Sequence, residues 1–224
     1  MDEQRYAARE RARALARESL ARGDALGWFE ELYREAGGAS SRVPWADGEG
    51  HPLLREWLAA HGASLRGARA LVVGCGLGED AEELARAGAR VSAFDVAPTA
   101  VAWCARLWPN SAVEYSTANL LSPPAHWRAA FDFVLEIYTL QALPAELREQ
   151  AARNMAQCLD TGGRLLAIAR AREPHEPLGE LPWPLVRGEI ERFAEFGLRQ
   201  RELEDLAGVG DPPTRHWRAL FQRA

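Results

Sequence analysis

The sequence has 224 residues, 47% of them hydrophobic, which is enough for one globular domain with a complete core. The formal net charge of −5 at pH 7 argues against a general affinity for nucleic acid. No apolar run approaches the ~20 residues of a membrane-spanning helix, so no membrane partner is predicted.

The cysteines and histidines suggest neither a metal site nor a disulfide framework. The three cysteines are scattered, with no C-x-x-C spacing. Four histidines lack a carboxylate pattern that would suggest a catalytic triad or a metal site: His51, His61, His126 and His216. The N-terminal residues lack the apolar stretch of a signal peptide. We therefore predict a reduced, cytoplasmic protein without a metal.

The amino-terminal part is predicted to be helical. Residues 2–22 are rich in Ala, Arg and Glu and indicate a charged helix. Residues 26–36 carry aromatic and apolar side chains at helical spacing, and a third helix is predicted over 53–61. The first helix is either a solvated surface helix or a lid over a ligand. We expect a helical segment or lid at 1–62 and a core at 63–224, within one structural domain.

From residue 69 the chain alternates between strand and helix patterns, which is typical of an α/β fold. The predicted strands are 69–73, 90–94, 112–115, 131–136 and 163–169, with 198–206 and 214–222 as a final hairpin. The predicted helices of this part are 79–87, 98–107, 144–159 and 185–196. Residues 172–184 hold four prolines, so we expect an ordered loop over a site or a surface strap.

A glycine-rich turn is the most informative motif. It follows the apolar residues 70–73, opens the helix at 79–87 and contains glycines at alternate positions, namely Gly74, Gly76 and Gly78. A buried strand, a tight glycine turn and a helix start form a seat for a nucleoside ligand. The spacing is G-x-G-x-G rather than the G-x-G-x-x-G of dinucleotide sites, and Glu79 and Asp80 add negative charge that opposes a pyrophosphate. A zwitterionic or cationic ligand is compatible with that charge.

Asp95 closes the second predicted strand, where a carboxylate can accept hydrogen bonds from both ribose hydroxyls. The glycine turn followed by Asp95 resembles the class I S-adenosylmethionine-dependent methyltransferases. That resemblance makes S-adenosyl-L-methionine the expected cofactor and implies a Rossmann-like, seven-stranded, mostly parallel sheet with an antiparallel last strand. Its predicted contacts besides the glycines and Asp95 are Trp45, Cys75 through its backbone, Val96, Asn119, Leu120 and Glu136. Asn119 is expected at the adenine, or else it is simply a turn residue.

Several further stretches resemble the thiopurine S-methyltransferase family and its bacterial relatives. They are Trp28-Phe-Glu-Glu-Leu-Tyr33, Pro44-Trp45, Pro52-Leu-Leu54, Phe131-Asp-Phe-Val-Leu-Glu-Ile-Tyr-Thr-Leu-Gln-Ala-Leu-Pro144 and Leu159-Asp-Thr-Gly-Gly-Arg-Leu-Leu166. The resemblance covers about residues 28–222. It departs from the family after the fourth strand, where Glu136 is followed by Ile137 and Tyr138 instead of an Asp-Arg pair, and this corner faces the methyl acceptor.

The acceptor-site candidates are Glu136, Tyr138 and His175. Glu136 either holds the methionine ammonium or acts as a base, and Tyr138 is a candidate hydrogen-bonding group beside the acceptor. Trp45 is either a hydrophobic plug or an aromatic wall beside the sulfonium. His175 lies in the proline-rich loop, where a lone histidine is more often exposed and inert.

The predicted function is methylation of a small molecule, and a thiol is the preferred acceptor because it ionises without a strong base. Oxygen or nitrogen methylation of a small aromatic or natural-product acceptor is the alternative. A nucleotide-cofactor oxidoreductase and a non-catalytic binding module are rivals from other classes. The partners are expected to be the acceptor alone or a second copy of the chain, in a monomer or homodimer.

Overall fold

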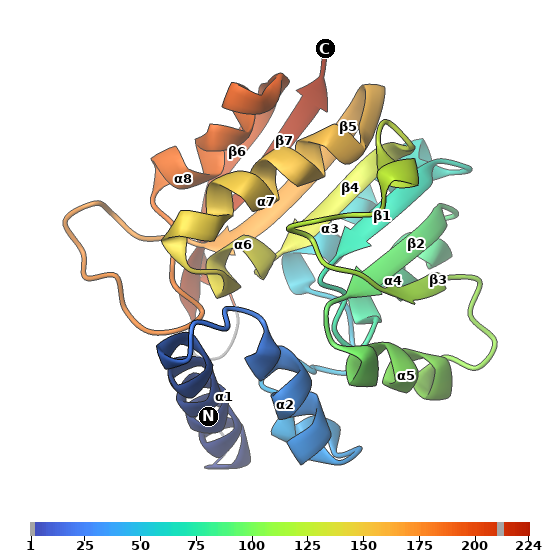
Figure 1. Ribbon diagram of the computed structural model, residues 1–224. Coiled ribbons are helices and arrows are strands. Elements are labelled where there is room, and N and C mark those ends of the chain that lie inside the picture. The colour runs from blue at the N-terminus through green and yellow to red at the C-terminus, as the bar shows by residue number, and fades with distance from the viewer. Residues whose placement is uncertain (1–2, 210–212) are drawn as a thin grey trace.

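A seven-stranded sheet with the order β3-β2-β1-β4-β5-β7-β6 forms the centre of the molecule (Figure 1). The computed structural model describes residues 3–209 and 213–224. The strands are β1 (Arg69–Val73), β2 (Arg90–Asp95), β3 (Glu114–Thr117), β4 (Phe131–Ile137), β5 (Leu159–Arg170), β6 (Leu198–Val209) and β7 (Thr214–Arg223). Strand β7 pairs antiparallel with both β5 and β6, and the other pairs are parallel. The predicted fold class is confirmed.

The helices of the described residues flank this sheet and cap one end of it. The α-helices are α1 (Glu3–Ala21), α2 (Gly27–Ala36), α3 (Pro52–His61), α4 (Glu79–Arg86), α5 (Pro98–Leu107), α6 (Thr139–Ala142), α7 (Ala145–Cys158) and α8 (Arg187–Glu191). Short 3₁₀ helices are η1 (Ser40–Arg42), η2 (Gly62–Leu65), η3 (Ala125–Trp127) and η4 (Arg192–Phe196). None of the helices in the described part of the chain is long and apolar enough to cross a membrane.

Most predicted elements occur with small shifts of their ends, and three differ more. Strand β3 lies two residues later than predicted, at 114–117. Strand β5 begins at Leu159 rather than at residue 163, because Leu159 pairs with Phe131 beyond an irregularity in the register. The residues that were expected to form the turn before this strand therefore belong to the strand. The helix predicted over 185–196 is a short α8 followed by η4. Asp2, the first residue of the first predicted helix, lies outside the described residues.

The central strands read as continuous apolar runs because helices cover both faces of the sheet. Successive residues of a strand point to opposite faces, so Leu71 and Val73 pack on the side of α7 and α8, whereas Ala70 and Val72 pack on the side of α3 and α4. Phe133 on β4 is fully buried on the second side and its ring stacks on Trp57 of α3, with 5.5 Å between centroids. Each face therefore has its own core.

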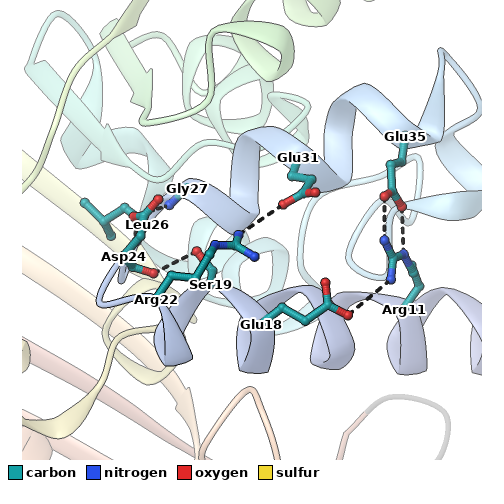
Figure 2. A network of polar contacts seen from close by, with 9 residues as sticks. All are labelled: Arg11, Glu18, Ser19, Arg22, Asp24, Leu26, Gly27, Glu31 and Glu35. Atoms are coloured by element: carbon teal, nitrogen blue, oxygen red, sulfur yellow. Dashed lines mark hydrogen bonds and ion pairs between the residues drawn. The ribbon is translucent and has the colours of Figure 1, made fainter.

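Helices α1 and α2 lie side by side at one end of the sheet (Figure 1), and they are joined by polar contacts (Figure 2) and by an apolar cluster. Arg11 donates to Glu35 at 2.7 Å, and Arg22 lies 3.7 Å from Glu31. Asp24 accepts from the backbone amide of Gly27 at 2.8 Å and so holds the start of α2. Exposed ion pairs contribute only about 0–1 kcal/mol each. The attachment of α1 therefore depends mainly on its apolar cluster with α2, formed by Ala12, Leu15, Ala16, Trp28, Leu32 and Leu181.

We predict that Phe133→Ala lowers the free energy of unfolding by about 3–5 kcal/mol, because it removes a fully buried ring between β4 and α3. Urea denaturation followed by circular dichroism measures the change. Leu107→Ala is the matched control: Leu107 is 51% exposed, and its truncation should change stability by less than about 0.5 kcal/mol. Equal effects of the two substitutions would contradict this packing.

Candidate functional site

A cavity of about 580 Å³ opens where the carboxyl ends of β1, β2 and β4 meet. In the strand order, β1 lies between β2 and β4, so the chain reverses its direction of winding there, and open α/β sheets bind ligands at such switch points. Helices α1 and α2 supply the opposite wall. This volume is within the range of about 300–1,000 Å³ that is usual for small-molecule sites.

The glycine turn forms the floor of this cavity. All three glycines have positive φ, at +62° for Gly74, +56° for Gly76 and +91° for Gly78. A Cβ on Gly74 would lie 2.6 Å from Thr139 Oγ1, and a Cβ on Gly78 would collide with the Tyr115 hydroxyl. The alternate glycines are thus required by backbone conformation and by close packing, independently of any ligand.

Asp95 is buried at the end of β2 and lines the cavity. Its two carboxylate oxygens accept from the backbone amides of Gly76 at 3.0 Å and Ala97 at 2.9 Å. Burial raises the pKa of Asp95 to about 6, although these amide hydrogen bonds oppose the shift. The carboxylate therefore holds the glycine turn against β2 while facing the cavity.

Four other predicted cofactor contacts are placed at the cavity by the structure, and their side chains have different roles. Val96, Asn119 and Leu120 also line the cavity. The side-chain oxygen of Asn119 accepts from the Leu121 amide at 2.8 Å, so Asn119 has the turn role that was its alternative interpretation. Cys75 also lines the cavity, but its thiol is buried, and a hydrogen bond with Cys104 and burial raise its pKa. Such a thiol is a poor nucleophile.

Trp45 has the contacts of the predicted plug and also borders the cavity, and its place beside a sulfonium stays a prediction. Its indole Nε1 donates to the buried Tyr33 hydroxyl at 2.8 Å, and its ring makes edge contacts with Trp28 and Tyr33. These contacts are those of a plug between α2 and the sheet. The same half-buried ring lines the cavity near Gly76, where a Cβ would lie 3.4 Å from the indole. Trp45 is therefore also a wall.

Tyr138 lines the cavity at the end of β4 and has a positive φ of +63°. A non-glycine residue in this conformation costs roughly 1–2 kcal/mol, and such strain is concentrated at functional sites. Its phenol lies between two histidines. His51 Nε2 is 2.8 Å from the phenol oxygen, and His216 Nε2 is 2.6 Å from it. Arg170 lies over the Tyr138 ring, 5.6 Å from its centroid.

The meeting of His51 and His216 at Tyr138 was not predicted from the sequence. His51 precedes α3 and His216 is on β7, so the two are 165 positions apart in the chain. Both line the cavity. Burial, with smaller effects of His216 and Arg170, lowers the pKa of His51 to about 3. Burial also lowers the pKa of His216 to about 4. Only folding brings them to Tyr138, and the sole sequence signal was the placement of Tyr138 at a strand end.

Two of the three predicted acceptor-site residues do not reach the cavity. Glu136 is fully buried, does not belong to the described cavity lining, and accepts from the Leu140 amide at 2.9 Å at the start of α6. Burial raises the pKa of Glu136 to about 7. His175 is exposed in the proline-rich loop, away from the described lining, although Leu181 and Pro182 of that loop do line the cavity. The loop therefore lies over the site as predicted, but His175 does not.

Asp80 is a further carboxyl group at the cavity, and it is partly buried. Its side chain accepts from the His51 amide at 2.7 Å, which ties the loop before α3 to the start of α4. Burial raises the pKa of Asp80 to about 7. Within residues 3–209 and 213–224, no group of three or more His, Cys, Asp or Glu side chains is arranged to hold a metal ion.

Comparison with known proteins identifies the class of domain. Residues 70–163 match the family model described as methyltransferase domain. A ubiquinone biosynthesis O-methyltransferase from Nitrosococcus oceani is 32% identical over 140 residues, which is 58% of this chain and 58% of that relative. The chain thus spans somewhat more than half the length of the curated relatives it matches. Over residues 70–163 the chain is therefore similar to methyltransferase domains.

Solved structures share the fold over most of the chain. The N-methyltransferase NodS from Bradyrhizobium japonicum, solved with S-adenosyl-L-homocysteine, superposes with a TM-score of 0.66 at 23% identity and covers 86% of this chain and 96% of its own. A protein from work on the conversion of a disulfide bond into a thioacetal group during echinomycin biosynthesis gives 0.69 at 20% identity, with coverages of 87% and 90%. The narrower resemblance to thiopurine S-methyltransferases is not shown, because the curated relatives described here are ubiquinone O-methyltransferases.

We predict that the free energy of unfolding of Glu136→Gln, relative to that of the wild type, increases as the pH rises. The folded-state pKa of about 7 lies above the unfolded value of 4.5, so the stabilisation from the protonated carboxyl is present at low pH and is lost as the pH rises through 7. Between pH 5 and pH 8 the wild type should lose about 2 kcal/mol that the amide variant keeps.

Urea denaturation of both proteins at the two pH values measures this difference. Glu114→Gln, at an exposed position on β3, is the control and should show no such trend. A constant difference between wild type and Glu136→Gln would mean that Glu136 ionises as it does in water, which contradicts its burial.

Proposed function

We propose that this protein is an S-adenosylmethionine-dependent methyltransferase that methylates a small molecule inside the cavity at the ends of β1, β2 and β4. The proposal depends on one observation: a single cavity is lined by the glycine turn, by Asp95 and by Tyr138 with its two histidines. NodS, which shares the fold, was solved with S-adenosyl-L-homocysteine, and this supports the same ligand class here.

The residues of the cavity fit this cofactor. Asp95 is a buried carboxylate whose oxygens can each accept a second hydrogen bond, as two ribose hydroxyls require. The bare backbone of Gly76 leaves room beside Trp45, and an aromatic face attracts a sulfonium by about 0.5–2 kcal/mol. Val96, Asn119 and Leu120 are the proposed adenine neighbours. When bound, S-adenosylmethionine supplies an activated methyl group, and the protein aligns the acceptor and excludes water.

The acceptor atom that we propose is a hydroxyl oxygen. The curated relatives are named as O-methyltransferases, which favours oxygen over the thiol predicted from the sequence. A hydroxyl needs help in losing its proton, and the cavity contains neutral histidines beside Tyr138. The thiol acceptor, the cytoplasmic location and the monomeric or dimeric state remain predictions.

The cofactor proposal predicts a specific pH dependence. Isothermal titration should show S-adenosylmethionine binding that is constant above about pH 7 and weakens below pH 6 by up to about tenfold per pH unit, because ribose hydroxyls donate to the ionised form of Asp95. Asp95→Asn should weaken binding by about 1.5–3 kcal/mol and flatten the pH dependence. Glu114→Gln is the control and should leave both unchanged.

Unchanged affinity in Asp95→Asn would remove Asp95 from the ribose site. Binding of a nicotinamide dinucleotide in place of S-adenosylmethionine would favour the oxidoreductase alternative. Binding of S-adenosylmethionine without transfer to any acceptor of a broad panel would favour a binding module.

The acceptor proposal predicts an order of preference. In competition at neutral pH, matched phenol, thiophenol and aniline acceptors with S-adenosylmethionine labelled in its methyl group should give mainly the labelled methyl ether. Mass spectrometry of the products measures the partition. Labelled thioether as the main product, with little ether, would restore the thiol prediction.

A further inference from the structure

We propose that His51, Tyr138 and His216 form a directed hydrogen-bond relay that takes up the proton of a hydroxyl acceptor during methyl transfer. This inference rests on the proposed function, because it requires S-adenosylmethionine and a hydroxyl acceptor in the same cavity. All three residues line that cavity. They come from the loop before α3, the end of β4 and the start of β7.

The direction of the relay follows from its two ends. The backbone amide of Leu53 points to His51 Nδ1 at 3.3 Å and can only donate, so His51 Nδ1 accepts and His51 Nε2 carries the proton. His51 Nε2–H therefore donates to the Tyr138 oxygen at 2.8 Å.

At the other end, the carbonyl of Thr214 lies 3.1 Å from His216 Nδ1 and can only accept. His216 Nδ1 therefore carries the proton, and His216 Nε2 accepts from the Tyr138 hydroxyl at 2.6 Å. The relay runs from His51 through Tyr138 to His216, with opposite tautomers at its two histidines.

The phenol oxygen has a second acceptor position, which a ligand can share with Arg170. It donates one hydrogen bond to His216 and accepts one from His51, and a hydroxyl oxygen has two acceptor lone pairs. The second lone pair is within hydrogen-bonding reach of the Arg170 guanidinium, and because Tyr138 borders the cavity, the hydroxyl proton of an acceptor takes this position from Arg170 in the proposed scheme. The left-handed backbone of Tyr138 fixes the ring between the histidines.

The proton movement balances the methyl transfer. A lone pair of the acceptor oxygen forms the bond to the methyl carbon, and the electron pair of the breaking carbon–sulfur bond returns to sulfur. The acceptor proton passes to the Tyr138 oxygen while the Tyr138 proton passes to His216 Nε2. The products are a methyl ether, a neutral thioether and an imidazolium, so the positive charge lost at sulfur reappears at His216, which releases its proton to water after turnover.

Arg170 assists this exchange at the middle of the relay. Its guanidinium lies over the Tyr138 ring and opposes the rise in the pKa of that phenol caused by burial. Its Nε is buried and has no hydrogen-bond partner among the described residues. In this scheme Tyr138 is the catalytic residue that touches the acceptor, and Arg170 is a positioning residue.

The relay itself is tested without any acceptor. In ¹⁵N-labelled protein, long-range proton–nitrogen NMR spectra should show the Nε2–H tautomer at His51 and the Nδ1–H tautomer at His216. Both should stay neutral down to about pH 5, because burial and the charge of Arg170 lower the pKa of each histidine, while Asp80 and Glu136 act on the Tyr138 phenol between them. The same tautomer at both histidines would overturn the inference.

The catalytic role is tested with Tyr138→Phe and His216→Gln. With phenol acceptors, kcat should fall by about 100-fold or more in each variant, whereas calorimetric affinity for S-adenosylmethionine should change by less than about twofold. Tyr6→Phe, at a residue that is 53% exposed, and His61→Gln are controls outside the cavity lining and should retain activity.

Three outcomes separate the explanations. Ether formation that survives Tyr138→Phe overturns the relay and leaves the proposed function standing. Methylation of thiols or amines alone, or of no acceptor, by protein that binds S-adenosylmethionine overturns the relay together with the hydroxyl acceptor. Failure to bind S-adenosylmethionine overturns the proposed function itself.

Discussion

Three carboxyl groups hold the edge of the sheet where the cavity opens, and each does so by accepting hydrogen bonds from backbone amides. Asp95 accepts from Gly76 and Ala97, Asp80 from His51, and Glu136 from Leu140. Asp95 and Glu136 are buried and Asp80 is partly buried; a buried carboxylate without such partners would be very costly, and loop amides without acceptors would be costly as well. Asp95 therefore fixes the loop after β1 to the end of β2, Asp80 fixes the loop before α3 to the start of α4, and Glu136 fixes the start of α6 to the end of β4.

This arrangement has an electrostatic consequence for the unliganded protein. Burial raises the pKa of all three carboxyl groups toward neutrality. Two of them, Asp80 and Asp95, line the cavity, so at neutral pH a cationic or hydrogen-bonding ligand can stabilise them in their ionised form. A sulfonium and two ribose hydroxyls have the required chemistry, which links the folding of this edge to the proposed ligand.

The opposite wall of the cavity is built differently. Helix α2 lines it with aromatic side chains, and Trp45 is hydrogen-bonded to Tyr33 of that helix, whereas α1 lines it with Ala12 and three arginines, Arg5, Arg9 and Arg13. Arg13 of α1 also donates to the carbonyl of Leu181 at 3.1 Å, so the proline-rich strap and the first helix close the site together. The predicted lid is thus in position to cover a ligand, and whether it opens remains a prediction. This wall is therefore aromatic where α2 forms it and positively charged where α1 forms it.

The sequence by itself determined the alternation of strands and helices, the glycine turn and Asp95, because these depend on local apolar runs, on backbone conformations that favour glycine and on a strand that ends in an acid. It did not determine that Glu136 would turn away from the cavity to hold α6, since the two faces of a strand end look alike in sequence. It also gave no sign that His51 and His216 would meet at Tyr138. Histidines in the loop before α3 and on β7 are brought together only by the order of strands in the sheet and by the packing of α3 against it, and tertiary structure decides both.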